Sequence, residues 1–180
     1  QAISIGENAG NSSHGQYAIA IGTAAGHSSQ GYTSIAIGNN AGNEDQSNNS
    51  IAIGNYAGHY KQNNNSIALG NDAGKFNQGK LSIAIGNKAG VLYQSDNSII
   101  LNARDISLNS DSSGLFIAPI NEGKPINEGI QDKILYYDVS KGEIKYDNIS
   151  VSSSSAGSTA TNESFKSNTN NTSVSTTGIS

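Results

Sequence analysis

Histidines are the side chains in this sequence best suited to acid–base or metal chemistry, and there are three of them. His27 and His59 occupy the same place in a repeating unit but lie two units apart. If each unit adds one strand spacing, the two rings are roughly 10 Å apart. That is too far to share one metal ion. Only a ring of one histidine from each of several chains would bring such side chains together, so the histidines are best interpreted as loop residues exposed to solvent.

The carboxylates show no pattern of the kind that glycoside cleavage or Ca²⁺ binding requires, which is a repeated close pair or cluster. They occupy unrelated places in the repeat: Glu44, Asp45, Asp72 and Asp96. The Gly-x-x-x-Gly motifs lack the Lys-Ser/Thr of a phosphate-binding loop. The chain also has no cysteine, which excludes thiolate catalysis, disulfides and cysteine-based metal sites. The sequence therefore indicates no catalytic residue, no metal site, no cofactor and no enzyme activity.

The composition excludes further classes of protein. Ten basic residues stand against 14 acidic ones, giving a formal net charge of -4, so the chain has no basic surface to attract a phosphate backbone. No stretch is long and apolar enough to span a membrane, and no secretion signal pattern is present. We therefore expect neither nucleic-acid binding nor membrane insertion. Ser (28), Asn (24) and Gly (21) dominate the 180 residues, and these residue types need a structural explanation.

That explanation is an internal repeat with a period of sixteen positions, which continues without a slip through the first hundred positions. The consensus reads S-I-A-I-G-N-x-A-G followed by seven polar residues centred on a glutamine. Two columns of glycine mark each unit: Gly22, Gly38, Gly54, Gly70 and Gly86, and Gly26, Gly42, Gly58, Gly74 and Gly90. Glycine readily adopts the positive φ of tight turns, so both columns are predicted to be turns at the corners of stacked coils.

Ser-Ile-Ala-Ile alternates as a β-strand does, so the isoleucines point to one face and the alanine to the other. We expect the larger side chains to form the interior of the coil. The predicted core is Ile19, Ile21, Ile35, Ile37, Ile51, Ile53, Ile67, Leu69, Ile83 and Ile85. The sequence thus predicts an all-β fold, a β-roll or β-solenoid in which one repeat makes one coil.

The alanine column is then predicted to face outward. It comprises Ala20, Ala36, Ala52, Ala68 and Ala84. An exposed strand face is usually polar, whereas a stripe of small residues suits close approach to another chain. We therefore expect an oligomer, most simply a homotrimer with cyclic symmetry. The alternative is that alanine is tolerated on the exposed face of a monomer.

The motif Ser34-Ile-Ala-Ile-Gly38 and its copies resemble the head repeats of YadA-type trimeric autotransporter adhesins. The resemblance covers residues 2–101 and implies a left-handed β-roll wound as a trimer. The chain differs from those adhesins in its fixed and longer period, and it lacks their neck, heptad stalk and membrane anchor.

After residue 101 the second glycine column disappears and the alanine column becomes Ile100, so the roll is predicted to end there as domain 1–101. Residues 102–148 are predicted to form a β-rich stem, with a hairpin of Ile134–Val139 and Ile144–Tyr146 turning at Gly142. The order of apolar segments over residues 98–147 is similar to the stems of trimeric fibre and spike proteins of phages and large DNA viruses.

Residues 149–180 are rich in Ser, Thr and Asn and are predicted to be a tail or linker. Such a segment buries too little apolar surface to order itself, but it could add a strand to the sheet edge of a neighbouring subunit. The tail is therefore a candidate element for higher assembly.

Two functions remain open. The first is a structural fibre, spike or surface-filament segment of a virion, extracellular and trimeric, that attaches to a host. The second is a bacterial surface adhesin of the trimeric autotransporter type, whose receptor would be a host glycan or matrix protein. Sugar sites present exposed aromatic faces. The aromatic residues near the loops form no single column: Tyr17, Tyr32, Tyr56, Tyr60, Phe76 and Tyr93.

Overall fold

A computed structural model describes residues 1–120 and 133–148 of the chain, and all regular structure in those residues is β. The chain divides into two units, Gln1–Asn121 and Glu122–Ser180. The first is a β-solenoid with two parallel sheets: the first five coils contribute one strand to each sheet, and the later coils contribute a strand to the larger sheet alone. The predicted all-β fold and the predicted length of the coil, 16 residues, are confirmed. Each repeated strand pairs with the strand one repeat further on, as Ile35 does with Ile51.

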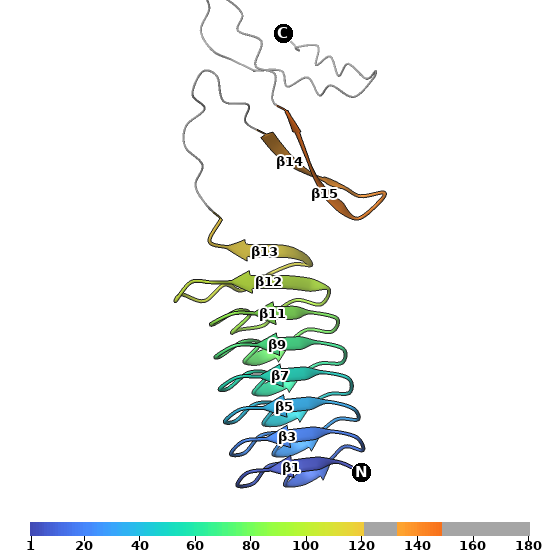
Figure 1. Cartoon of the computed structure of the whole chain (residues 1–180), viewed down its shortest axis with the longest axis vertical. Coiled ribbons are helices and arrows are strands. Elements are labelled where there is room, and N and C mark those ends of the chain that lie inside the picture. Colours follow the sequence, from blue (N-terminus) through green and yellow to red (C-terminus); the bar gives the residue numbers. More distant parts are fainter. Residues whose placement is uncertain (121–132, 149–180) are drawn as a thin grey trace, which may run out of the picture. The chain divides into compact units, whose positions relative to one another are not determined.

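The larger sheet, called sheet A, carries the repeated isoleucines and is stacked strand upon strand (Figure 1). In spatial order its strands are β1 (Ile3–Ile5), β3 (Ile19–Ile21), β5 (Ile35–Ile37), β7 (Ile51–Ile53), β9 (Ile67–Leu69), β11 (Ile83–Ile85), β12 (Ser98–Asn102) and β13 (Gly114–Ala118). Sheet B is formed by β2 (Ser12–His14), β4 (Ser28–Gln30), β6 (Glu44–Gln46), β8 (Tyr60–Gln62) and β10 (Phe76–Gln78).

The glycine columns lie at turns, as predicted. Gly54 has a φ of 132° and Gly58 a φ of 54°. The first column also needs glycine for space, since a Cβ built on Gly54 would collide with the carbonyl oxygen of Gly70 in the next coil. The same φ pattern recurs through Gly22, Gly26, Gly38, Gly42, Gly70, Gly74, Gly86 and Gly90.

The predicted orientation of the strand is wrong, because the alanines and not the isoleucines form the interior. All five alanines of the column, for example Ala52, have no exposed surface. The isoleucines of the predicted core point outward and are half-buried, or exposed in the case of Ile85. A second alanine column joins the interior, consisting of Ala25, Ala41, Ala57, Ala73 and Ala89. The proposed alanine interface between chains is therefore wrong as well.

The reason is the small width of the coil. A Cβ built on Gly58 would lie 3.1 Å from the Cβ of Ala52, so the two walls almost touch at this level. An isoleucine at position 52 would need volume that the wall of Gly58 and Ala57 already occupies. At this position, the interior of the coils that carry both glycines can therefore accommodate alanine but no branched side chain, and the larger residues are left on the outer face.

The remaining interior space is filled by glutamine and serine. The glutamine of each sheet B strand from β4 onward is buried, and its amide donates to a carbonyl of sheet A, as from Gln62 to Ile51 at 2.8 Å. The buried serine before each of the sheet A strands β5, β7, β9 and β11 donates to a backbone carbonyl three residues earlier, as from Ser66 to Asn63 at 2.6 Å. Each coil is thus held across its width by hydrogen bonds as well as by apolar contact.

The solenoid does not end at residue 101. Strand β13 pairs in parallel with β12, from Ser98↔Gly114 to Asn102↔Ala118, so sheet A continues for another coil. Here the interior widens. Ile100 replaces the alanine, is fully buried, and packs in one cluster with Leu108 and Phe116. The coil that lacks the second glycine can therefore accept a large residue where earlier coils could not.

The predicted hairpin is present in the second unit. It consists of β14 (Lys133–Asp138) and β15 (Glu143–Asn148), with Gly142 at a φ of 68°. The Asp138 carboxylate accepts hydrogen bonds from Lys145 Nζ at 2.7 Å and from the Ser140 hydroxyl at 2.6 Å. These contacts hold the pKa of that carboxyl well below its usual range. The predicted tail, 149–180, lies outside the described residues.

Candidate functional site

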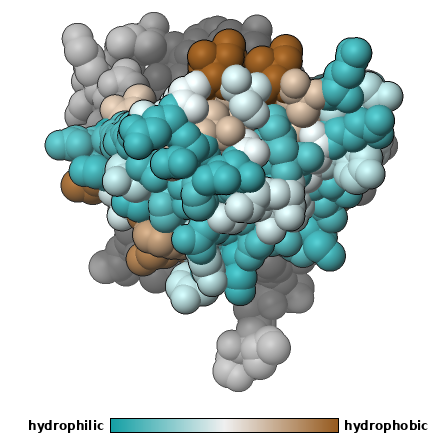
Figure 2. Space-filling model, turned by 90° about the horizontal axis from the view of Figure 1, so that it is seen from below, coloured by the Kyte–Doolittle hydropathy of each residue, from teal (hydrophilic) through white to brown (hydrophobic). Residues whose placement is uncertain are grey.

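The outward side chains of sheet A form one continuous apolar surface, which we call the isoleucine face. Two side chains from each strand contribute to it. They are Ile3, Ile5, Ile19, Ile21, Ile35, Ile37, Ile51, Ile53, Ile67, Leu69, Ile83, Ile85, Ile99, Leu101, Leu115 and Ile117. Viewed from the N-terminal coil, hydrophobic residues gather at one edge, at the top of Figure 2, while most of the remaining coloured surface is hydrophilic.

Exposure along the isoleucine face is high for apolar side chains. Ile5 is 58% exposed, Ile85 41% and Leu115 48%, and most of the residues between them are half-buried by their neighbours in the ladder. Soluble monomers rarely present an apolar surface that extends over so many strands, and large patches of this kind mark sites of interaction. The face consists of Ile and Leu side chains, which offer apolar contact area and no titratable or nucleophilic group.

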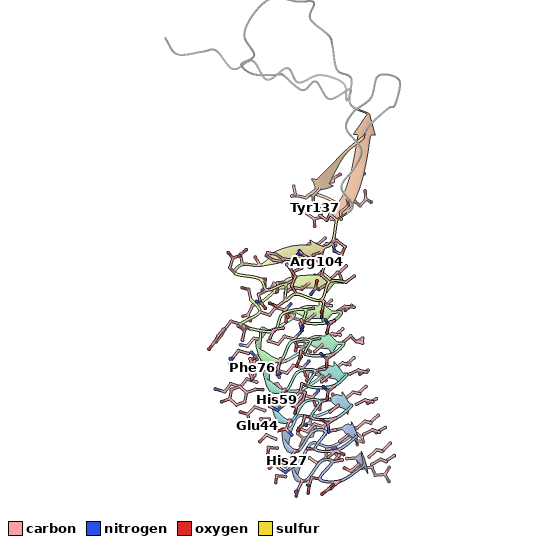
Figure 3. The ribbon with its side chains drawn as sticks, turned by 90° about the vertical axis from the view of Figure 1, so that its left-hand side faces the viewer. His27, Glu44, His59, Phe76, Arg104 and Tyr137 are labelled. Atoms are coloured by element: carbon pink, nitrogen blue, oxygen red, sulfur yellow. The ribbon has the colours of Figure 1, made fainter. Side chains whose placement is uncertain are left out.

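The outward column of sheet B differs completely. Reading from the N-terminal coil it contains Ser12, Ser28, Glu44, Tyr60 and Phe76, and Leu92 follows through an isolated bridge to Phe76. The column therefore changes from small polar residues to large apolar ones along the rod. Figure 3 shows His27, Glu44, His59 and Phe76 on the side of the roll opposite the sheet A strands.

Four rings and a lysine gather in the middle of this opposite side, and we call them the aromatic patch: Tyr56, His59, Tyr60, Phe76 and Lys75. The ring centroids of Tyr56 and His59 are 5.2 Å apart, and those of His59 and Phe76 are 6.2 Å apart with their planes nearly perpendicular. Lys75 Nζ lies 4.8 Å from the Tyr56 centroid and 5.5 Å from that of Phe76. Two consecutive coils thus build one cluster.

The charges around the aromatic patch almost balance. Lys75 pairs with Asp72 at 2.8 Å, and Lys61 Nζ lies 5.3 Å from the Tyr60 centroid. Burial lowers the pKa of His59, and Lys75 lowers it further, against the opposing effects of Glu44 and Asp72. The net effect holds the pKa of His59 below its ordinary value and so favours the neutral imidazole.

A hollow of about 410 Å³ lies at the carboxyl ends of β4 and β6 in sheet B. Its lining residues are polar or glycine: Ser29, Gly31, Asp45, Gln46, Ser47, Asn48 and Asn64. Two of its amides accept hydrogen bonds from the backbone: Asn48 from the Tyr32 N–H at 2.8 Å and Asn64 from the Asn48 N–H at 3.0 Å. The hollow is therefore a by-product of an asparagine ladder that runs along the coil corner.

The remaining candidates from the sequence are scattered. His27 contacts the adjacent Ser28 hydroxyl, at 3.0 Å, and Asp96 accepts the Lys80 N–H at 2.7 Å. Within residues 1–120 and 133–148, no three His, Asp or Glu side chains come close enough together to hold a metal ion. The same residues include no helix long and apolar enough to cross a membrane.

The sequence did not reveal the aromatic patch, because its members are spread over three columns of the repeat, none of which is aromatic in every coil. Tyr56 and His59 come from one coil, and Phe76 and Lys75 from the next. A signal was present: the column from Ser12 to Leu92 changes in every coil after the second, although the interior columns do not. Comparisons of the chain with protein-family models, with curated proteins and with solved structures found no match.

Proposed function

We propose that the chain is a structural segment of a trimeric extracellular rod, a fibre or spike of a virion that takes part in host attachment. The observation that carries the proposal is the isoleucine face. A β-solenoid provides a stiff rod whose outer faces are flat, and this one presents an apolar face along its whole described length.

The partner is a set of identical copies. The isoleucine face repeats once per coil, so a second copy aligned in parallel meets the same side chain at every coil. Identical subunits close most simply by rotation about one axis, and three such faces turned toward an axis would bury one another. The predicted trimer is retained, but its interface is now assigned to the isoleucines and no longer to the alanines.

Light scattering on the full chain tests this assignment. We expect three times the chain mass for the unmodified protein and a single chain mass for Ile53→Glu, because charges from three copies would meet at the axis. Lys80→Glu, on an exposed turn residue outside sheet A, is the matched control and should remain trimeric. A monomer or dimer for the unmodified chain would contradict the proposal.

A second candidate, a bacterial surface adhesin that binds a host glycan or matrix protein, is favoured by one observation, the aromatic patch. Exposed rings beside polar groups are the usual surface for sugar recognition. The virion fibre and the bacterial adhesin would use the same rod, and they differ in what the side opposite sheet A contacts.

A further inference from the structure

We propose that the aromatic patch is a binding site for a neutral carbohydrate. The inference deepens the attachment role given under the proposed function and rests on it, but it does not depend on trimer formation. Three observations support it: the outward residues of sheet B change along the rod, the charges around the rings almost balance, and the rings are half-buried on an outer side of the roll.

The patch departs from the repeat where the fold does not require it. The outward position of sheet B is serine in the first two coils, Ser12 and Ser28, and those coils form the same strands as the coils that carry Tyr60 and Phe76. Tyr56 has a φ of 53°, a conformation that tyrosine adopts less readily than the asparagine found one coil earlier at Asn40. These rings are therefore not explained by the needs of the coil.

The rings have the form of a sugar platform. Tyr60 and Phe76 are half-buried and neighbours in the ladder, so each keeps part of its ring at the surface. The C–H face of a pyranose packs on such rings, while its hydroxyls need polar partners close by. Glu44 supplies an exposed carboxylate directly opposite Tyr60 in the register, and Lys61 supplies an exposed ammonium group.

Charge decides the class of sugar. An anionic ligand would meet Glu44 and Asp72, and the cation nearest the rings, Lys75, is already paired with Asp72. A cationic ligand would compete with Lys75 for the faces of Tyr56 and Phe76. A neutral hexose or N-acetylhexosamine meets neither electrostatic penalty.

The rings are half-buried on an outer side of the roll, so we expect a single site of this kind to bind weakly, and several sites presented together to bind more strongly through effective concentration. The experiment therefore displays the full chain at high density on beads and incubates them with an array of immobilised oligosaccharides. The array includes neutral galactose-, glucose- and N-acetylhexosamine-terminated chains together with sialylated and sulfated ones.

We expect retention on neutral glycans, reduced about tenfold or more in Phe76→Ser and in Tyr60→Ser, because each removes one stacking surface. Both substitutions introduce the residue that the first two coils carry at this position, so the coil is expected to fold. Tyr32→Asn is the matched control: it removes an exposed aromatic ring elsewhere and introduces the residue found at Asn48 and Asn64, and it should bind within about twofold of the unmodified chain.

Three outcomes would overturn the proposal: no retention on any glycan, retention on sialylated or sulfated glycans alone, or binding that survives both serine substitutions. Because the beads supply multivalency whether or not the chain is a trimer, failure here leaves the light-scattering result unaffected. If the chain is a trimer but binds no glycan, the proposed sugar site is refuted and the proposed trimeric rod stands.

Discussion

The two outer sides of the solenoid share one backbone and one period, yet their side chains follow different rules. On sheet A the outward residue is isoleucine or leucine in every coil, whereas on sheet B it changes from Ser28 to Glu44 to Tyr60. The interior explains the repetition of alanine, glutamine and glycine, because those residues pack against one another. It does not explain repetition on an outer face. The regularity of the isoleucine face is what the proposed contact with identical copies requires, and the irregular side is where we propose local recognition.

The largest expected loss of stability follows a substitution on the interior face of sheet A, and the same substitution on the outer face should cost much less. Ala52→Glu places an unpaired carboxylate in a fully buried site and should destabilise the rod by about 4 kcal/mol or more. Ile53→Glu, one residue away on the outer face, should leave the coils folded. Thermal unfolding followed by circular dichroism distinguishes the two. Equal loss of structure in both variants would mean that the assigned faces are wrong.

A smaller but still large effect is expected at the glycine corners. Gly54→Ala should lower the free energy of unfolding by about 2–3 kcal/mol, because its φ of 132° is unfavourable for alanine and the new Cβ would meet the Gly70 carbonyl. Asn55→Ala, at the next and exposed position, serves as the control and should cost under about 0.5 kcal/mol. Denaturant unfolding measures both. A Gly54→Ala variant as stable as the control would refute the steric account.

The interior amides give an intermediate effect. Gln62→Leu keeps the volume but removes the donor to the Ile51 carbonyl, and we expect a loss of about 1–3 kcal/mol. Asn71 makes a similar ladder of amides on the surface, with Asn55 and Asn87. Asn71→Leu should change the free energy of unfolding by less than about 0.5 kcal/mol, since water replaces its partners. If the surface ladder proves the more costly to remove, burial is not what makes the glutamine column important.

The period, the strands, the glycine turns and the hairpin could all be predicted from the sequence, because each depends on local spacing or on φ. The direction in which the strand faces could not. Alternation separates Ile51 and Ile53 from Ala52, but it does not say which set is inside, and a shift of one residue exchanges the two faces. The usual rule that large apolar residues lie inside fails here because the coil is too narrow.

The candidate surfaces were limited in the same way. Both are formed by residues whose neighbours come from other coils, and the aromatic patch combines Tyr56 with Phe76 through the stacking and not through the sequence. The end of the roll was also misplaced, since β13 lacks the repeat motif but still pairs in parallel with β12. Backbone pairing leaves little trace in residue types.

The smallest expected effect concerns the turns, which both sides of the rod share. Leu81 has a φ of 54°, in a column where Asn49, Asn65 and Asn97 have the same conformation. Asparagine adopts this region more readily than leucine, and Leu81 is 59% exposed, so little apolar contact is lost on replacement. Leu81→Asn should therefore raise the free energy of unfolding by about 0.5–1 kcal/mol.

Leu92→Asn makes the same chemical change on an exposed residue that is not among those with positive φ, and it should give no gain. Denaturant unfolding of the two variants decides the matter: an equal gain in both would mean that solubility and not backbone strain is responsible, and no gain at Leu81 would mean that the coil holds this turn without measurable cost.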